Sequence, residues 1–290
     1  DCSFAKKSLE GLLYNEKAKK NPFIIFAATS HLLNYSSHLP CDLFTSCLLT
    51  PAKVALLWQS QKVGHFQSGI LKEIDLQTLI DQLNDSEEAP NILTVLNSAL
   101  NAIADKIAID YLLNSDNTNL FFQLFRSDAF TSQLLYNYMF STRVMNALAM
   151  DPCSFPPMID STQHPLWDTF DLQVDRTLFS LVNSFAPIHI PHSIFSMNDL
   201  LNEAMEKLQS WLRFPIVGRK MPNEICYLPM LLLSQSHFKQ AIVFCSNFIQ
   251  ISEKTAKIFL FTRSFPVLPT CLNRIEKNIE MYDAETIAAF

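Results

Sequence analysis

The sequence predicts a mostly helical protein with a short α/β region at its N-terminal end. From about residue 71 onward, apolar residues recur every three to four positions, which is the period of an amphipathic helix. Hydrophobic residues make up 49% of the 290 residues and charged residues 17%, so the chain can bury a sizeable core and is too apolar to be disordered. Residues 23–28 differ, because FIIFAA is a continuous apolar run after Pro22, which is typical of a buried strand.

The first sixty residues carry this α/β signal. Residues 2–13 fit an amphipathic helix, and a helix followed by a buried strand is half of a parallel βαβ unit. Residues 43–48 are predicted to add another strand. Thr50 followed by Pro51 is a good helix start, with Thr as N-cap and Pro at the first helical position, and this helix is expected to reach about Gln61.

The middle of the chain shows a succession of helical stripes. Asp105 and Asp110 fall off the apolar face of the second of these stripes. Prolines at 152, 156 and 157 predict a linker before the last helix of this region. The apolar stripes lie at about 74–83, 92–107, 120–125, 130–150 and 166–185.

A second proline-containing break, with Pro187 and Pro191, leads into several short helices. Each of them has more apolar surface than one neighbour can cover, and an armadillo-type stack of helical units solves that problem. Ser196 and Asp199 resemble a capping box at the start of the first. The predicted helices lie at about 197–213, 227–235, 238–250, 253–262 and 266–276.

Composition argues against several classes of function. The formal net charge is −6 and the cations are scattered, so nucleic-acid binding is disfavoured. Only four glycines occur, all isolated, whereas phosphate-binding loops and nucleophile elbows need glycine, so no cofactor is predicted. We find no signal-peptide pattern and no apolar run long enough to cross a bilayer, and we expect a cytoplasmic protein without integral membrane association. Because the chain begins with Asp1, we expect it to be N-terminally truncated.

Seven cysteines are too few and odd in number for a disulfide framework in a chain of this size, and most are expected to be buried free thiols. Cys2 is the sharpest candidate for chemistry, because it is predicted to lie at the end of a strand and just before a helix, where a thiol pKa can be lowered. A cysteine peptidase also needs a histidine partner, and none of the seven histidines has a spacing that marks it. The alternative is a buried thiol.

A metal site is the next hypothesis. His31, His38, Cys41 and Cys47 fall within seventeen residues, but their spacings match no common zinc pattern, so no metal is predicted. His189 and His192 are expected to be surface residues of a proline-broken loop.

Two further groups have simple structural interpretations. Asp168, Asp171 and Asp175 share one face of a helix, which we interpret as its solvated face. The three tryptophans are expected in the core: Trp58, Trp167 and Trp211.

Several segments resemble the raptor family, the scaffold subunits of TOR kinase complexes. The most specific is residues 42–48, DLFTSCL, followed by residues 50–58, TPAKVALLW. The others are weaker alone, but they occur in the same order as in the family and span nearly the whole chain. They are DCS at 1–3, LFRSD at 124–128, HPLW at 164–167 with Asp171 to Asp175, and LLSQSH at 232–237.

The resemblance implies a caspase-like α/β domain, a helical region and then armadillo-type repeats. On this basis we assign residues 1–62 to the C-terminal part of the caspase-like domain, 63–186 to the helical region and 187–290 to the start of the repeats. It also implies a non-enzymatic scaffold in growth and nutrient signalling, which binds a TOR-type kinase and recruits substrates through a motif of the form Phe-x-apolar-acidic-apolar. Cys2 would then stand at a degenerate nucleophile position.

Within this interpretation, Arg126 is a candidate cation for the acidic residue of a bound peptide, and its alternative roles are a solvent-exposed arginine or a structural salt bridge. Phe44 and Trp58 are expected in the core. The family carries a basic pair where this chain has Ser86 and Glu87, which puts substrate choice in doubt. Two other functions stay open: a caspase-like cysteine peptidase with Cys2 as nucleophile, and an unrelated helical adaptor.

Overall fold

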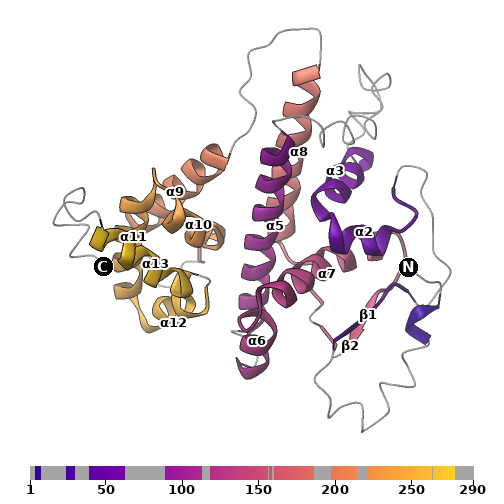
Figure 1. Ribbon diagram of the computed structural model, residues 1–290, viewed down its shortest axis with the longest axis horizontal. Helices are drawn as coiled ribbons and strands as arrows, with labels where there is room; N and C mark the ends of the chain where they lie inside the picture. The colour runs from indigo at the N-terminus through magenta and orange to yellow at the C-terminus, as the bar shows by residue number, and fades with distance from the viewer. Residues whose placement is uncertain are drawn as a thin grey trace. The chain divides into compact units, whose positions relative to one another are not determined.

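A computed structural model describes most of the chain (Figure 1). The described residues are 4–7, 24–29, 39–62, 89–112, 118–155, 157–158, 160–185, 197–213, 221–262 and 264–277. They form two compact units, Asp1–Ile194 and Phe195–Phe290, and each is treated by itself. The three-part division at residues 62 and 186 stays a prediction.

The N-terminal strand lies in a two-stranded ribbon. β1 (Ile25–Ala27) pairs antiparallel with β2 (Cys153–Phe155), so that Ile25 faces Phe155 and Ala27 faces Cys153. The strand in residues 23–28 is confirmed, but it is half-buried along Ile25 and Phe26. Its partner strand lies in the segment that the prolines had predicted to be a linker. The pairing among the described residues is antiparallel, whereas the sequence predicted a parallel unit.

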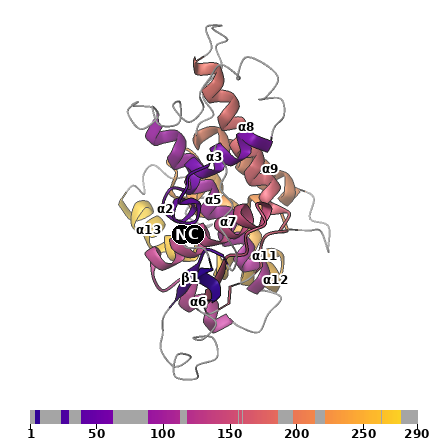
Figure 2. The ribbon, with the colours of Figure 1, turned by 90° about the vertical axis from the view of Figure 1, so that its right-hand side faces the viewer.

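The segment at 43–48 is a helix and not the predicted strand. α2 (Leu43–Leu49) buries Leu43, Phe44 and Cys47, whose spacing of one and four places all three on one helical face. The apolar run is therefore one face of a helix and not a strand. This helix packs against α7 (Figure 2). The next helix is confirmed, since α3 (Pro51–Lys62) begins at the predicted proline.

Four further helices follow in the described part of unit 1, and all four were predicted. They are α5 (Ala89–Leu112), α6 (Thr118–Phe125), α7 (Ala129–Ala147) and α8 (Leu166–Phe185). α5 packs against both α7 and α8, and α3 also packs against α8 (Figure 1). The core lies along α5, where Leu96, Ile103 and Ile107 are fully buried.

One segment of α5, Ile92–Tyr111, is long and apolar enough to span a bilayer by length and composition alone, with a mean hydropathy of 1.4. The protein itself buries 72% of this window, and the central helix of a soluble core has the same properties.

α7 ends in a Schellman motif, three residues before the predicted end at Met150. The amide of Met150 donates to the Met145 carbonyl at 2.9 Å, and that of Ala149 to the Asn146 carbonyl at 3.1 Å. Ala149 has a φ of 59°, a left-handed conformation that usually requires glycine. The motif turns the chain toward β2.

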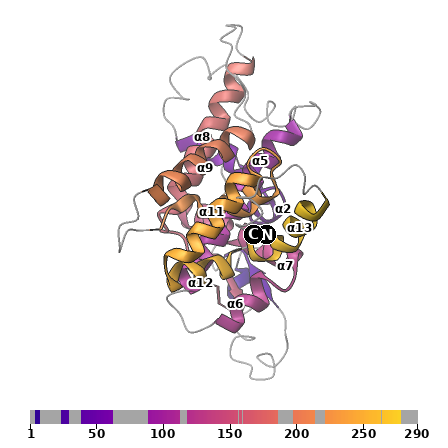
Figure 3. The ribbon, with the colours of Figure 1, turned by 90° about the vertical axis from the view of Figure 1, so that its left-hand side faces the viewer.

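Unit 2 consists of short helices in close succession, as predicted. It comprises α9 (Met197–Arg213), a 3₁₀ turn η5 (Asn223–Tyr227), α10 (Leu228–Leu233), α11 (Phe238–Ile251), α12 (Glu253–Phe261) and α13 (Ser264–Lys277). α11 packs against α9, α10 and α12, and α13 packs against α10 and α12 (Figure 3). The predicted bounds of α9 agree with the structure. Ser196 lies outside the described residues, so its capping box stays a prediction.

Candidate functional site

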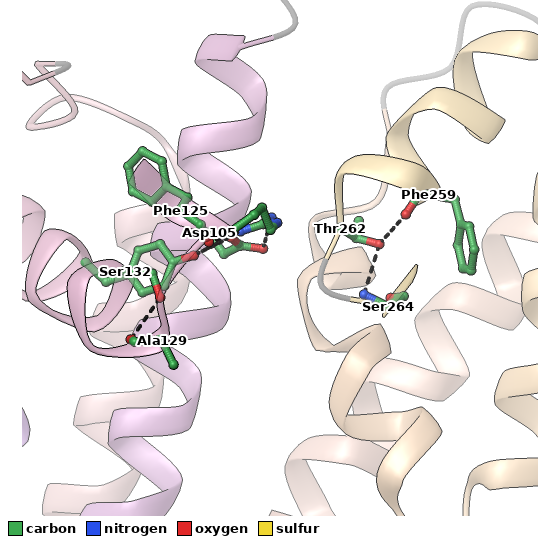
Figure 4. Close-up of polar contacts among 9 residues, drawn as sticks. Asp105, Phe125, Ala129, Ser132, Phe259, Thr262 and Ser264 are labelled. Atoms are coloured by element: carbon green, nitrogen blue, oxygen red, sulfur yellow. Dashed lines mark hydrogen bonds and ion pairs between the residues drawn. The ribbon is translucent and has the colours of Figure 1, made fainter. Parts of the chain in front are cut away.

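Arg126 lies at the end of α6 and binds a carboxylate on α5. Its Nη1 donates to Oδ1 of Asp105 at 2.7 Å and its Nη2 to Oδ2 at 3.1 Å, which is a two-pronged pair. Figure 4 shows Asp105 with its polar contacts as dashed lines. Nη1 also donates to the Phe125 carbonyl oxygen at 2.9 Å. The guanidinium thus links the C-terminal end of α6 to the middle of α5.

Aromatic side chains from α6 and α7 enclose this pair. The hydroxyl of Tyr136 donates to Oδ1 of Asp105, so the carboxylate accepts bonds from two elements. The Arg126 guanidinium lies 4.8 Å from the centroid of the Phe121 ring, and Phe125 stacks on Tyr136 at 5.6 Å. We call Asp105, Phe121, Phe125, Arg126 and Tyr136 the Arg126 cluster.

The two charged side chains of the Arg126 cluster lie mostly inside the protein. The Arg126 and Asp105 side chains are only 10% and 9% exposed. Burial alone would lower the pKa of the guanidinium, but the Asp105 charge and the bonds to Asp105 and Tyr136 outweigh it, so the pKa lies above its ordinary value. Arg126 is therefore always charged, and the charge of Asp105 is its counterpart inside the protein.

This geometry shows what peptide binding at Arg126 would require. A ligand carboxylate would have to exchange with Asp105 or bind beside it, because the described contacts already engage both Nη atoms. The arrangement matches the structural salt bridge that the sequence left as an alternative. The peptide-binding role stays a prediction.

The residues that follow Arg126 fix the start of α7. The Asp128 carboxylate accepts from the Thr131 amide at 2.6 Å, which is an N-cap bond. Hydrogen bonds from the Thr131 side chain and from its amide lower the pKa of Asp128. The hydroxyl of Ser132 donates to the Ala129 carbonyl at 3.0 Å (Figure 4). The LFRSD segment thus turns the chain from α6 into α7.

A second buried cation joins three helices. The Arg143 guanidinium on α7 lies 5.0 Å from the Trp58 ring of α3 and 5.3 Å from the Trp167 ring of α8. Both of its Nη atoms donate at 2.7 Å to the two oxygens of Asp171 on α8. We call Trp58, Arg143, Trp167 and Asp171 the Arg143 cluster.

The interpretation of the aspartates on α8 as a solvated face is correct only for Asp168, which is exposed. Asp171 accepts from Arg143, and Asp175 accepts from Nε2 of Gln59 at 3.0 Å. The same error applies to Asp105, which was placed off the apolar face of α5 but is 6% exposed. Each of these carboxylates is held by a side chain from another helix.

The HPLW segment begins α8. The indole Nε1 of Trp167 donates to the Ser161 carbonyl at 2.7 Å, and Nδ1 of His164 accepts from the Leu166 amide at 3.2 Å. His164 Nε2 lies 3.6 Å from the Asp110 carboxylate on α5. The segment therefore ties the start of α8 to the end of α5.

The remaining candidates are buried or lie outside the described residues, except Cys41, which is exposed. Cys47 and Cys245 are buried, and burial raises the pKa of both thiols, which keeps them protonated. Cys226 and Cys271 are also buried free thiols, as predicted. The described residues contain no group of three or more potential metal ligands. Cys2, His31, His38, His189 and His192 lie outside the described residues.

The tryptophans and Phe44 were correctly predicted to be buried, with Trp58 at 6%, Trp167 at 1%, Trp211 at 8% and Phe44 at 6% exposure. The sequence reading missed Arg143 and the partnership of Asp105 with Arg126. The available signal was a lone charge, since Arg143 is the single charged residue of the segment that forms α7.

Comparison with known proteins supports one relationship across most of the chain. No family model matches. The chain is 29% identical over 276 residues to "Regulatory-associated protein of TOR 2" of Oryza sativa subsp. japonica, covering 92% of this chain and 19% of that protein. It is 27% identical over 268 residues to "Target of rapamycin complex 1 subunit mip1" of Schizosaccharomyces pombe, covering 86% of this chain and 19% of that protein. The chain thus spans about a fifth of the length of these relatives.

A solved structure agrees with the sequence matches. The crystal structure of Chaetomium thermophilum Raptor superposes with a TM-score of 0.66 at 25% identity, over 91% of this chain and 24% of that one. The fold and these matches show a mostly helical chain that is similar to regulatory subunits of TOR complexes. More specifically, the matches include proteins named as raptor or as TOR-associated regulators, which supports the resemblance to raptor seen in the sequence.

Proposed function

We propose that this chain is part of a non-enzymatic scaffold of TOR complex 1. In this role it binds a TOR-type kinase and recruits substrate proteins through short peptide motifs, in growth and nutrient signalling in the cytoplasm. The supporting observation is the extent of the matches, since four relatives, named as TOR-associated regulators, a raptor homolog and a TOR complex 1 subunit, each align with 84% or more of this chain.

The positions of the resembling residues strengthen this proposal. Arg126, Asp128 and Trp167 make bonds that join or begin helices of unit 1, and His237 does the same in unit 2. A similarity confined to one exposed loop could arise from one shared ligand. A similarity in the residues that set helix packing implies a shared arrangement of helices. A scaffold functions through this arrangement, because it positions the surfaces that bind other proteins.

We further propose that residues 1–62 include the C-terminal part of a caspase-like α/β domain, followed by a helical region to residue 186 and then by armadillo-type repeats. The half-buried strand β1 and the DCS segment support the first part. The close succession of helices from α9 to α13 supports the last.

Substrate recruitment is proposed to use the surface around the Arg126 cluster. The partner would be a peptide with an acidic residue between apolar ones, and Phe122 and Phe130 offer exposed aromatic surface close to Arg126 in sequence, at 41% and 71% exposure. Ser86 and Glu87 replace a basic pair of the family, so we expect weaker attraction for strongly acidic peptides.

Co-purification tests the proposal directly. The natural protein that carries this chain is tagged and purified from its own cells, and the bound proteins are quantified by mass spectrometry. More TOR-type kinase should be recovered with this protein than with a control bait, an unrelated helical-repeat protein of similar size. A folded bait that recovers other partners, with the kinase at the level of the control, would overturn the proposal.

The alternative is a caspase-like peptidase, which the DCS segment favours. Treatment of the natural protein with a peptidyl electrophile, with Cys2→Ser as the control, separates the two functions. The scaffold proposal predicts no adduct on Cys2 beyond that of a general alkylating reagent. Rapid labelling of Cys2 that requires the peptide part of the reagent would support the peptidase.

A further inference from the structure

His237 is a buried titratable side chain at a junction of helices in unit 2. It precedes α11 in the turn that follows α10, and its side chain reaches α9. The residue is only 4% exposed, although Gln235 and Ser236 beside it are exposed. A side chain that can change its charge near neutral pH therefore lies inside the contact between three helices.

Both ring nitrogens of His237 have partners. Nε2 lies 2.8 Å from Oδ1 of Asn202 on α9, and an amide oxygen can only accept, which assigns the hydrogen to Nε2. Nδ1 lies 2.9 Å from the hydroxyls of Ser234 and Ser236, which are 3.1 Å from each other. The single lone pair of Nδ1 accepts one hydroxyl hydrogen, and the other hydroxyl donates to its neighbour. The neutral ring therefore satisfies the whole set.

The surroundings disfavour a second positive charge. Arg274 of α13 stacks on the Phe238 ring at 4.7 Å, and its Nη1 is 3.4 Å from the carbonyl oxygens of Leu233 and Ser234. The ring also lies at the N-terminal end of α11, where the helix dipole is positive. A proton on Nδ1 would force the hydroxyl that donates to Nδ1 to turn away and to accept instead.

The charged and titratable groups on the surrounding elements are of both signs. α10 carries none, and Lys207 of α9 pairs with Glu224 of η5 at 3.0 Å, so that acid is already engaged. The full set on these elements is Asp199, Glu203, Glu206, Lys207 and Arg213 on α9, Glu224, Cys226 and Tyr227 on η5, Lys239 and Cys245 on α11, and Cys271, Arg274, Glu276 and Lys277 on α13.

We propose that His237 is a pH-sensitive latch that holds α9 against the turn between α10 and α11 when its ring is neutral and loosens that contact when the ring is protonated. Burial lowers the pKa of His237 below its ordinary value, in agreement with this geometry. The unfolded chain takes up this proton near pH 6.5, whereas the folded chain resists it. The latch is therefore complete above that pH and is lost as the pH falls through it.

Hydrogen exchange of the 290-residue chain, followed by mass spectrometry at pH 7.5 and 5.5 and compared at matched intrinsic exchange, tests the latch. The opening of α9 should increase at least about threefold at pH 5.5 relative to that of α5. In His237→Gln the opening should be high at both pH values and independent of pH. His164→Gln, in unit 1, is the matched control and should keep the pH response of α9.

A second variant keeps the test decisive if His237→Gln does not fold. Asn202 is exposed, and Asn202→Ala removes only the acceptor on α9. The latch predicts raised opening of α9 at pH 7.5 and little further change at pH 5.5. Wild-type protein without a pH response in α9, or an Asn202→Ala variant with the full wild-type response, would overturn the proposal.

Discussion

The two units of this protein hold their helices together in different ways. In unit 1, the described side-chain bonds of three carboxylates join different helices: Arg126 at the end of α6 binds Asp105 on α5, Arg143 on α7 binds Asp171 on α8, and Gln59 on α3 binds Asp175 on α8. In unit 2, many of the described polar bonds are local. Ser252 caps α12 with Thr255, and Thr262 donates to the Phe259 carbonyl and accepts from the Ser264 amide (Figure 4).

This difference has an energetic meaning. When one partner of a largely buried ion pair between two helices is lost, the other is left as an uncompensated charge inside the protein. Such a pair therefore enforces a specific packing of the two helices. A local cap affects only the end of its own helix. His237 with Asn202 and Arg274 with the end of α10 are the longer connections in unit 2, and they join helices that pack side by side.

The largest predicted effect is at Asp105. Asp105→Ala leaves the guanidinium of Arg126 buried without its carboxylate, and we expect a loss of about 3–5 kcal/mol in the free energy of unfolding. Urea unfolding followed by circular dichroism measures it. Glu253→Gln, in the exposed pair with Lys257, is the matched control and should produce no measurable change. A loss as small as that of the control would remove the distinction between the two units.

Arg143 tests whether stacking adds to charge pairing in unit 1. Arg143→Ala should destabilise the chain by about 2–4 kcal/mol, because it removes the partner of Asp171 and the cation between Trp58 and Trp167. Arg143→Lys keeps the charge but loses the two-pronged bond, and should recover only part of the loss. The same urea titration compares the two variants. Full recovery by lysine would show that the geometry is unimportant.

Ser252 tests the local side of the comparison. Ser252→Ala removes the capping box at the start of α12, and we expect a loss of about 1 kcal/mol. Hydrogen exchange should locate the added opening in α12 and leave α9 unchanged. Opening that spreads through all of unit 2 would mean that the cap has more than a local role.

The smallest predicted effect has the opposite sign. Ala149→Gly relieves the left-handed conformation at the end of α7, and the gain exceeds the added freedom of the unfolded chain by about 0.5 kcal/mol. The midpoint of thermal unfolding should therefore rise slightly. Asn146→Gly, inside α7, is the matched control and should lower it. A lower midpoint for Ala149→Gly would contradict the assigned motif.

The same contrast explains what the sequence could predict. Helix periodicity and caps are local, so the helices from α3 onward in the described residues were predicted, and α9 was predicted with its bounds. β2 was missed because prolines flank it and its partner lies more than 120 residues earlier. α2 was mistaken for a strand because a short apolar run does not reveal its own period.

The candidate site follows the same rule. Arg126 was singled out from a resembling segment, but its bond to Asp105 depends on how α5 and α6 pack, which no local pattern encodes. Asp171 and Asp175 share a helix face, and the sequence could not show that Arg143 and Gln59 lie opposite them. The residue types were visible in the sequence, whereas their partners required the fold.

A double-mutant cycle between Asp105 and Arg126 tests most directly whether the resembling residues form the frame of the protein. The unfolding free energies of wild type, Asp105→Ala, Arg126→Ala and the double variant give the coupling of the two side chains. We predict a coupling of about 2 kcal/mol or more, with the double variant close to the single ones in stability. Additive losses with no coupling would contradict this account and would free Arg126 for a role in binding.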